Sequence, residues 1–155
     1  MESKKELYTT VLAQLKSLME NEDDRISNLS NASALLMESL CDLNWAGFYL
    51  MKNGCLQLGP FQGKTACIRI PIGRGVCGTA VLEDKTQLVP DVHQFPGHIA
   101  CDCASRSEIV VPIRVEGNIV GVLDIDSPIL ARFDEEDQEG LEEFVRILEA
   151  GCDWK

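Results

Sequence analysis

The segment that decides the fold is Glu108-Ile-Val-Val-Pro-Ile-Arg-Val-Glu-Gly-Asn-Ile-Val-Gly-Val-Leu-Asp-Ile-Asp126. Apolar and β-branched residues fill both halves, as in strands, and Glu116-Gly117-Asn118 separates them with a turn. The segment therefore predicts an antiparallel hairpin. A second hairpin is predicted upstream, where Trp45–Met51 and Cys55–Leu58 flank the strong two-residue turn Asn53-Gly54.

Helices are predicted towards both ends of the chain. Apolar residues recur at helical spacing over residues 7–19 and again over residues 26–40, with a charged break between the two stretches. A closing helix follows Asp134, which we expect to cap it, and a short helix is expected over Thr79–Glu83. The acidic residues from Glu135 to Glu143, Asp137 included, are expected to form the solvated face of the closing helix.

Two short strands complete the pattern, Ala66–Pro71 and Leu88–Val92, and the proline in the second suits an edge strand or a loop. Helices, then mostly antiparallel strands, then a last helix predict an α+β fold in which helices pack against a sheet. The length of 155 residues fits one domain, so we expect a single domain over residues 1–155.

Composition disfavours several classes of protein. No run of about 18 apolar residues is present to span a membrane, and the first residues lack the apolar core of a signal peptide, so a cytoplasmic location is expected. A net charge of −11 disfavours nucleic acid as a partner, because such binding relies on lysine and arginine. The chain has seven cysteines, an odd number that cannot pair completely, and disulfides are rare in the reducing cytoplasm. The cysteines therefore indicate catalysis, metal binding or inert burial rather than a disulfide framework.

The strongest chemical signal precedes the first strand of the downstream hairpin. The segment His98-Ile-Ala-Cys-Asp-Cys-Ala-Ser-Arg-Ser-Glu108 puts Cys101 at the edge of a Gly/Pro loop and a carboxylate seven residues further on. An accessible thiol beside an acid suits redox chemistry at sulfur, because the acid can protonate the atom that leaves. A metal site built from Cys101, Cys103 and the two histidines is less favoured, since C-x-C spacing is unusual for zinc, and no bound metal is expected.

Two carboxylates on one face of a strand normally indicate a solvated face, but if Glu108 joins Asp124 and Asp126, three carboxylates converge near that loop. Asp124 and Asp126 alternate with apolar residues along one strand, so both acids point to the same face, and Glu108 begins the partner strand. On an otherwise apolar strand such a cluster is costly unless it binds a cation or shares a proton, which raises at least one pKa. A pocket of this kind suits an ammonium group together with a proton donor.

Two aromatic residues and two further cysteines each have a structural and a functional interpretation. Trp45 and Tyr49 share one face of the first strand, where core packing is the favoured interpretation and an aromatic wall for a thioether-like or cationic ligand is the other. Cys67 and Cys77 are either small buried hydrophobic residues or resolving thiols, and the sequence leaves both open.

One glycine-rich segment, Gly73-Arg-Gly-Val-Cys-Gly78, matches the dinucleotide-binding fingerprint. The match is weak, because no parallel strand with an acidic residue follows at the distance that a dinucleotide fold needs. The segment instead predicts a plain turn from strand to helix. The exposed amides at the start of that helix are available as donors to a small ligand.

These residues together resemble the free methionine-(R)-sulfoxide reductases, which are stand-alone GAF-domain enzymes. The matching segments, which occur in consistent order from Trp45 to about Pro128, are Asn44-Trp-Ala-Gly-Phe-Tyr-Leu50, Gly75-Val-Cys-Gly78, Phe95-Pro-Gly-His-Ile-Ala-Cys-Asp102, Ser107-Glu-Ile-Val-Val-Pro112 and Gly121-Val-Leu-Asp-Ile-Asp-Ser-Pro128. The resemblance implies a GAF-like sheet of about six mostly antiparallel strands flanked by helices, and a homodimer.

The resemblance also implies a role for each candidate residue. Cys101 matches the catalytic nucleophile, Cys67 the principal resolving cysteine and Cys77 a third thiol found in some members. Glu108 is a candidate for the acid that protonates the departing oxygen. The residues that match the substrate pocket are Trp45, Tyr49, Glu108, Asp124 and Asp126.

The implied activity is thiol-dependent reduction of free methionine-(R)-sulfoxide to methionine, without a bound cofactor. Cys101 becomes a sulfenic acid, Cys67 condenses with it to a disulfide, and thioredoxin, supplied by NADPH and thioredoxin reductase, reduces that disulfide. Cys103, which is not part of the family motif, is an alternative resolving thiol. The alternative function is a non-catalytic GAF sensor that binds a small ligand.

Overall fold

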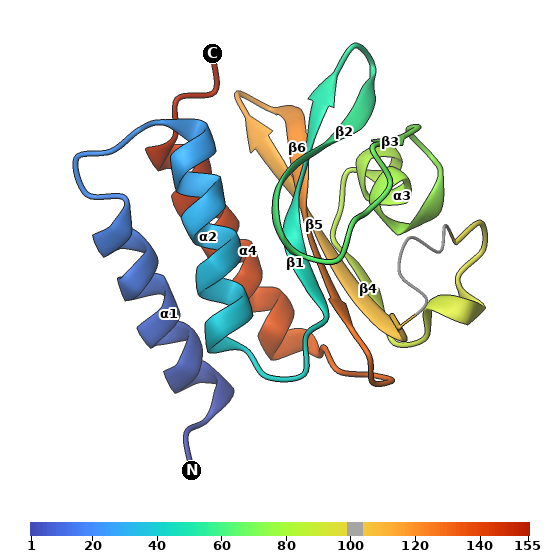
Figure 1. The fold of residues 1–155 in the computed structure, drawn as a ribbon, viewed down its shortest axis with the longest axis horizontal. Helices are drawn as coiled ribbons and strands as arrows, with labels where there is room; N and C mark the ends of the chain where they lie inside the picture. Colours follow the sequence, from blue (N-terminus) through green and yellow to red (C-terminus); the bar gives the residue numbers. More distant parts are fainter. Residues whose placement is uncertain (99–103) are drawn as a thin grey trace.

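An antiparallel sheet forms the frame of the molecule (Figure 1). The computed structural model describes residues 1–98 and 104–155. Within them the sheet has six strands in the order β3-β2-β1-β6-β5-β4, and all neighbours are antiparallel. The predicted α+β class is confirmed. The strands are β1 (Trp45–Lys52), β2 (Cys55–Gly63), β3 (Arg69–Ile70), β4 (Gln87–Val89), β5 (Ser107–Val115) and β6 (Asn118–Ser127).

The α-helices of the described residues cover the two faces of the sheet unequally (Figure 1). On one face lie α1 (Lys4–Leu18), α2 (Arg25–Ser39) and α4 (Glu135–Gly151), and on the other lies α3 (Gly75–Glu83). A short 3₁₀ turn, Val92–Gln94, follows β4. None of the described helices combines the length and apolar content that crossing a bilayer requires.

Two separate apolar layers result, because side chains alternate along each strand. Leu123 and Ile125 of β6 are fully buried under the three helices, in one cluster with Phe48 of β1. Val122 of the same strand belongs to the other cluster, beneath α3, with Trp45 of β1. Burial of each large apolar side chain contributes roughly 1.5–3 kcal/mol, so both layers hold the sheet in place.

Both predicted hairpins are present at the predicted positions. Asn53 and Gly54 have φ of 53° and 80°, and Glu116 and Gly117 have the same pair of values, as expected for tight two-residue turns. The edge-strand prediction for Leu88–Val92 also holds, although β4 is shorter and ends just before the proline. β2 extends further than predicted, to Gly63.

One strand prediction is wrong in extent. We expect a strand over Ala66–Pro71, and only Arg69–Ile70 forms one. The preceding segment is a loop because two side chains of β1 take its carbonyls: Trp45 Nε1 donates to Lys64 O at 3.1 Å, and Tyr49 Oη donates to Cys67 O at 2.9 Å. The predicted short helix also begins earlier, at Gly75 rather than Thr79.

The acidic start of α4 corrects another expectation. Asp134 caps the helix as predicted, in a full capping box with Asp137. Asp137 itself is not solvated: it is 1% exposed and accepts hydrogen bonds from Tyr8 Oη at 2.8 Å and Lys4 Nζ at 2.7 Å. Asp137 is buried because α1 packs against α4. The charge pattern of α4 alone does not predict this packing.

Candidate functional site

A pocket of about 540 Å³, counting its open mouth, lies between the sheet and α3. The sheet contributes all five residues that the sequence predicts to bind substrate: Trp45, Tyr49, Glu108, Asp124 and Asp126. Ile70 of β3, the first turn of α3 and three loops complete the lining, the last two with Thr65, Ala66, Arg74, Gly75, Val76, Cys77, His98 and Ser105.

Register explains why the three carboxylates meet. Glu108 on β5 pairs directly with Asp126 on β6, and Asp124 is two residues before Asp126, so all three side chains share one face. Glu108 is 7% exposed and Asp124 is 6% exposed. The convergence that strand alternation predicts is therefore present.

Burial changes the acidity of this cluster. It raises the pKa of Glu108 well above its usual value, and the charges of Asp124 and Asp126 raise that pKa further. Burial also raises the pKa of Asp124, although hydrogen bonds with Glu108, Cys77 and Asp126 oppose the change. The protonated form of Glu108 is therefore favoured more strongly in this cluster than in water.

The described residues place few opposite charges and hydrogen-bond donors beside these carboxylates. Neither Glu108 nor Asp124 forms an ion pair with a described lysine, arginine or histidine. Oδ1 of Asp124 is buried without a hydrogen-bond partner among those residues. Buried polar atoms are normally satisfied, so an unsatisfied carboxylate oxygen on a residue that lines a pocket indicates a place for a cationic ligand.

The aromatic wall consists of Trp45, Tyr49 and Phe61. Trp45 stacks on Tyr49 with ring centroids 5.9 Å apart and on Phe61 at 5.1 Å. Core packing is confirmed for Trp45 and Tyr49, which are 3% and 2% exposed, and both residues also line the pocket. Their hydrogen bonds to the Lys64 and Cys67 carbonyls, which no periodicity reveals, fix the loop carrying Cys67 beside the pocket.

The start of α3 forms the opposite wall. Arg74 is its N-cap residue and provides no side-chain hydrogen bond to the helix, so the first-turn amides are not capped by it. The glycine-rich segment is the plain turn that the sequence predicts. A Cβ on Gly78 would lie 2.5 Å from Pro71 O, so glycine is required for this close approach.

The cysteines fall into distinct states. Cys101 and Cys103, the predicted nucleophile and its neighbour, lie outside the described residues. Cys67 is half-buried and disulfide-bonded. Cys77 is a free thiol, 3% exposed, and burial followed by the charges of Asp124 and Glu108 raises its pKa well above the usual value. A thiol held protonated in this way is a poor nucleophile. The other free cysteines are Cys41, Cys55 and Cys152.

His98 is a pocket residue for which sequence reasoning favours no chemical role. It lines the pocket, and its ring lies 6.3 Å from that of His93 in an edge-on arrangement. Burial, then the neighbouring histidine, lowers the pKa of His98, while the charge of Asp124 raises it. Its position at the start of the Cys101 segment is the one sequence signal that favours it.

Fold and pocket together define a ligand-binding domain of the GAF class. Residues 24–151 match the family model described as GAF domain, and the chain belongs to that family. A free methionine-R-sulfoxide reductase of Escherichia coli (strain K12) is 54% identical over 147 residues, which cover 95% of this chain and 89% of the relative. The chain therefore belongs to the free methionine-R-sulfoxide reductases within the GAF domain family.

Two further comparisons agree. A free methionine-R-sulfoxide reductase of Saccharomyces cerevisiae (strain ATCC 204508 / S288c) is 44% identical over 161 residues, which cover 99% of this chain and 89% of that protein. The X-ray structure of the Neisseria meningitidis free methionine-R-sulfoxide reductase in complex with its substrate superimposes with a TM-score of 0.95. It is 47% identical, and the match covers 99% of this chain and 93% of that one.

Proposed function

We propose that this protein reduces free methionine-R-sulfoxide to methionine, with Cys101 as nucleophile and Glu108 as proton donor. One observation carries the proposal: three carboxylates, two of them more than nine-tenths buried, face an aromatic wall and an open helix start in one pocket. Relatives that share about half of this sequence are reductases of the same free amino acid.

Each part of a free methionine sulfoxide has a counterpart in the pocket. The α-ammonium group binds the carboxylates of Asp124 and Asp126, and the α-carboxylate binds the amides at the start of α3 together with Arg74. The side chain lies along Trp45 and Tyr49. A methionine sulfoxide inside a peptide has neither terminal charge, so selectivity for the free amino acid follows.

The chemical step moves one oxygen atom and two electrons. The Cys101 thiolate forms a bond to the sulfoxide sulfur while Glu108 protonates the oxygen. The hydroxyl group then moves from that sulfur to the Cys101 sulfur as the sulfur–sulfur bond breaks, which leaves Cys101 as a sulfenic acid and releases free methionine. The sulfoxide sulfur is reduced by two electrons, and the Cys101 sulfur is oxidised by two. A protonated Glu108 also lessens the negative charge of the pocket, which otherwise disfavours a thiolate.

Cys67 then closes the cycle. Its thiol condenses with the Cys101 sulfenic acid, releasing water and forming a disulfide, and the dithiol of thioredoxin reduces that disulfide by exchange. Support comes from the oxidised state of Cys67, since Cys77 and the other three described cysteines are free. NADPH and thioredoxin reductase supply the electrons, and we expect the enzyme to act as a homodimer in the cytoplasm.

The test is NADPH consumption with thioredoxin and its reductase, offered free methionine-R-sulfoxide, the S epimer and a peptide-bound sulfoxide. We expect turnover of the free R epimer alone. Cys101→Ser abolishes it, Cys67→Ser abolishes thioredoxin-dependent recycling, and Cys55→Ser, a substitution far from the pocket, has no effect. Full turnover by Cys67→Ser assigns the resolving role to Cys77 or Cys103. No turnover of any sulfoxide by the reduced protein leaves a ligand-binding GAF sensor as the better account.

A further inference from the structure

Three potential metal ligands from three different elements meet at the base of the pocket. The Cys77 thiol of α3, a Glu108 carboxylate oxygen of β5 and an Asp124 carboxylate oxygen of β6 all lie within 4.8 Å of one another, and all three residues are buried. We propose that these residues form a binding site for a thiophilic divalent cation of the Zn²⁺ and Cd²⁺ class, and that the bound cation blocks the pocket.

The spacing fits such an ion after small shifts. Three atoms no more than 4.8 Å apart always have a common point within roughly 2.8 Å of each. Zinc binds sulfur at about 2.3 Å and carboxylate oxygen at about 2.0–2.2 Å, so the donors need to move inward by no more than roughly 0.5–0.8 Å. The first turn of a helix and two hydrogen-bonded strands hold them, and side-chain torsions are sufficient for a movement of that size.

The donor set selects the class of metal. A thiolate with two carboxylates suits Zn²⁺, Cd²⁺ or Co²⁺, whereas Mg²⁺ and Ca²⁺ take oxygen donors. A second observation supports a ligand here: Oδ1 of Asp124, on a side chain more than nine-tenths buried, has no hydrogen-bond partner among the described residues. Three protein donors leave a fourth coordination position for water on the pocket side.

Binding of the cation and binding of the substrate exclude each other. The carboxylate of Asp124 is also the group proposed to hold the α-ammonium, so one positive charge displaces the other. This consequence rests on the proposed reductase function, whereas the metal site itself does not. Metal binding consequently inhibits the reductase, and inhibition weakens as the concentration of methionine sulfoxide rises.

The direct test uses protein in which Cys67 is disulfide-bonded, as in the structure, titrated with Co²⁺ or Cd²⁺. We expect one equivalent to bind with a sulfur-to-metal charge-transfer band in the ultraviolet. Cys77→Ser removes the band, and Asp124→Asn weakens binding at least tenfold without removing the thiol. The matched control is Cys55→Ser, which replaces a cysteine outside the pocket and leaves band and affinity unchanged.

Several results overturn the site. The site is contradicted if the unsubstituted protein shows no charge-transfer band, or if the band survives in Cys77→Ser. It is also contradicted if Mg²⁺ raises the melting temperature as much as Zn²⁺ does. These readouts need no turnover, so they stand even where the protein reduces no sulfoxide. The inhibitory role is tested separately. The concentration of Zn²⁺ that saturates the site is first found from its competition with Co²⁺ for the charge-transfer band. Full reductase activity at that Zn²⁺ concentration would show that the bound cation does not inhibit.

Discussion

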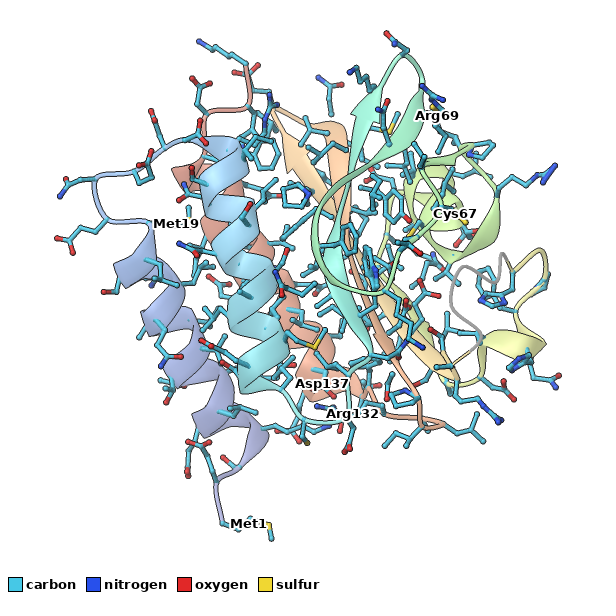
Figure 2. The ribbon with its side chains drawn as sticks, viewed as in Figure 1. Met1, Met19, Cys67, Arg69, Arg132 and Asp137 are labelled. Carbon is cyan, nitrogen blue, oxygen red and sulfur yellow. The ribbon has the colours of Figure 1, made fainter. Side chains whose placement is uncertain are left out.

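The molecule buries carboxylates on both faces of its sheet, and the two groups differ in what surrounds them. Asp137 lies in the layer of α1, α2 and α4, on the other side of the sheet from Cys67 and the pocket (Figure 2). It contacts Lys4 at 2.7 Å, Arg132 at 3.6 Å and Tyr8 at 2.8 Å. Asp124 is similarly buried and forms no ion pair with a described lysine, arginine or histidine.

The difference separates a structural acid from a functional one. Hydrogen bonds and opposite charges compensate Asp137 inside the protein, so its charge needs nothing from outside. The pocket carboxylates repel one another, and burial raises the pKa of Glu108 and of Asp124, so a bound cation or a proton stabilises the cluster. Substitution of a pocket carboxylate is therefore expected to lower activity and not stability, and substitution of Asp137 to lower stability and not activity.

The largest effect is expected at Glu108. Glu108→Gln removes the proposed proton donor but keeps the shape of the side chain, so reductase activity falls by roughly 10²–10⁴-fold. The free energy of unfolding does not fall at pH 7, because a costly buried acid has been replaced by a neutral amide. Steady-state kinetics and urea unfolding measure the two quantities. The control is Glu139→Gln on an exposed position of α4. A loss of activity that merely tracks unfolding would contradict the assignment.

Asp137→Ala is expected to give the opposite signature. It leaves Lys4, Tyr8 and Arg132 without their shared acceptor and lowers the free energy of unfolding by about 3–5 kcal/mol. The melting temperature falls by roughly 6–20 °C. Activity per folded molecule is unchanged, since the residue lies outside the pocket. Glu136→Ala, the exposed neighbour, is the matched control, and an equal loss in that variant would show that helix propensity rather than burial is responsible.

Gly140→Ala tests the packing that brings α1 onto Asp137. A Cβ at this position would lie 2.4 Å from the Tyr8 ring, closer than real contacts allow. The ring must move, at a cost of about 1–3 kcal/mol of stability, although alanine is the better helix former. Thermal unfolding of Gly140→Ala beside Glu139→Ala, its exposed neighbour, measures the cost. A higher stability of Gly140→Ala would mean that the Tyr8 ring moves aside at no cost in free energy.

The smallest expected effects are in the pH dependence of stability. The raised pKa of Glu108 stabilises the fold below its unfolded pKa, and this contribution is lost as pH rises through the folded value. Asp134 behaves in the opposite way: its hydrogen bond with Lys4 lowers its pKa from 3.8 to about 2, so its contribution is present above pH 3.8 and lost as pH falls towards 2.

Urea unfolding at a series of pH values separates these two contributions. Glu108→Gln flattens the decline in stability that begins as pH rises above 4.5, the ordinary pKa of this group. Asp134→Asn flattens the acidic side, and only slightly, because Asp134 is largely exposed and solvent screens its ion pair. If the free energy of unfolding fell as steeply above pH 4.5 in Glu108→Gln as in the unsubstituted protein, Glu108 would not be the origin of that fall.

Much of the fold is predictable from short stretches of sequence. The turn at Asn53-Gly54 and the cap at Asp134 depend on residues within three positions of each other. The shared face of Asp124 and Asp126 follows from strand alternation, which is a property of the backbone alone. The convergence of Glu108 needs one further step, the register of a hairpin whose turn is visible in the sequence.

The remaining features depend on contacts between distant parts of the chain. Asp137, which the charge pattern places in solvent, meets Lys4 across 133 positions because two helices pack together. The loop before β3 owes its shape to hydrogen bonds from Trp45 and Tyr49, and Cys77 reaches Glu108 and Asp124 because α3 lies over the sheet. The sequence by itself determined the two hairpins, their turns and the acids that share a face, since these follow from backbone geometry over a few residues. The tertiary structure decided which acids are paired, and therefore which are left for a ligand, because that depends on what packs against them.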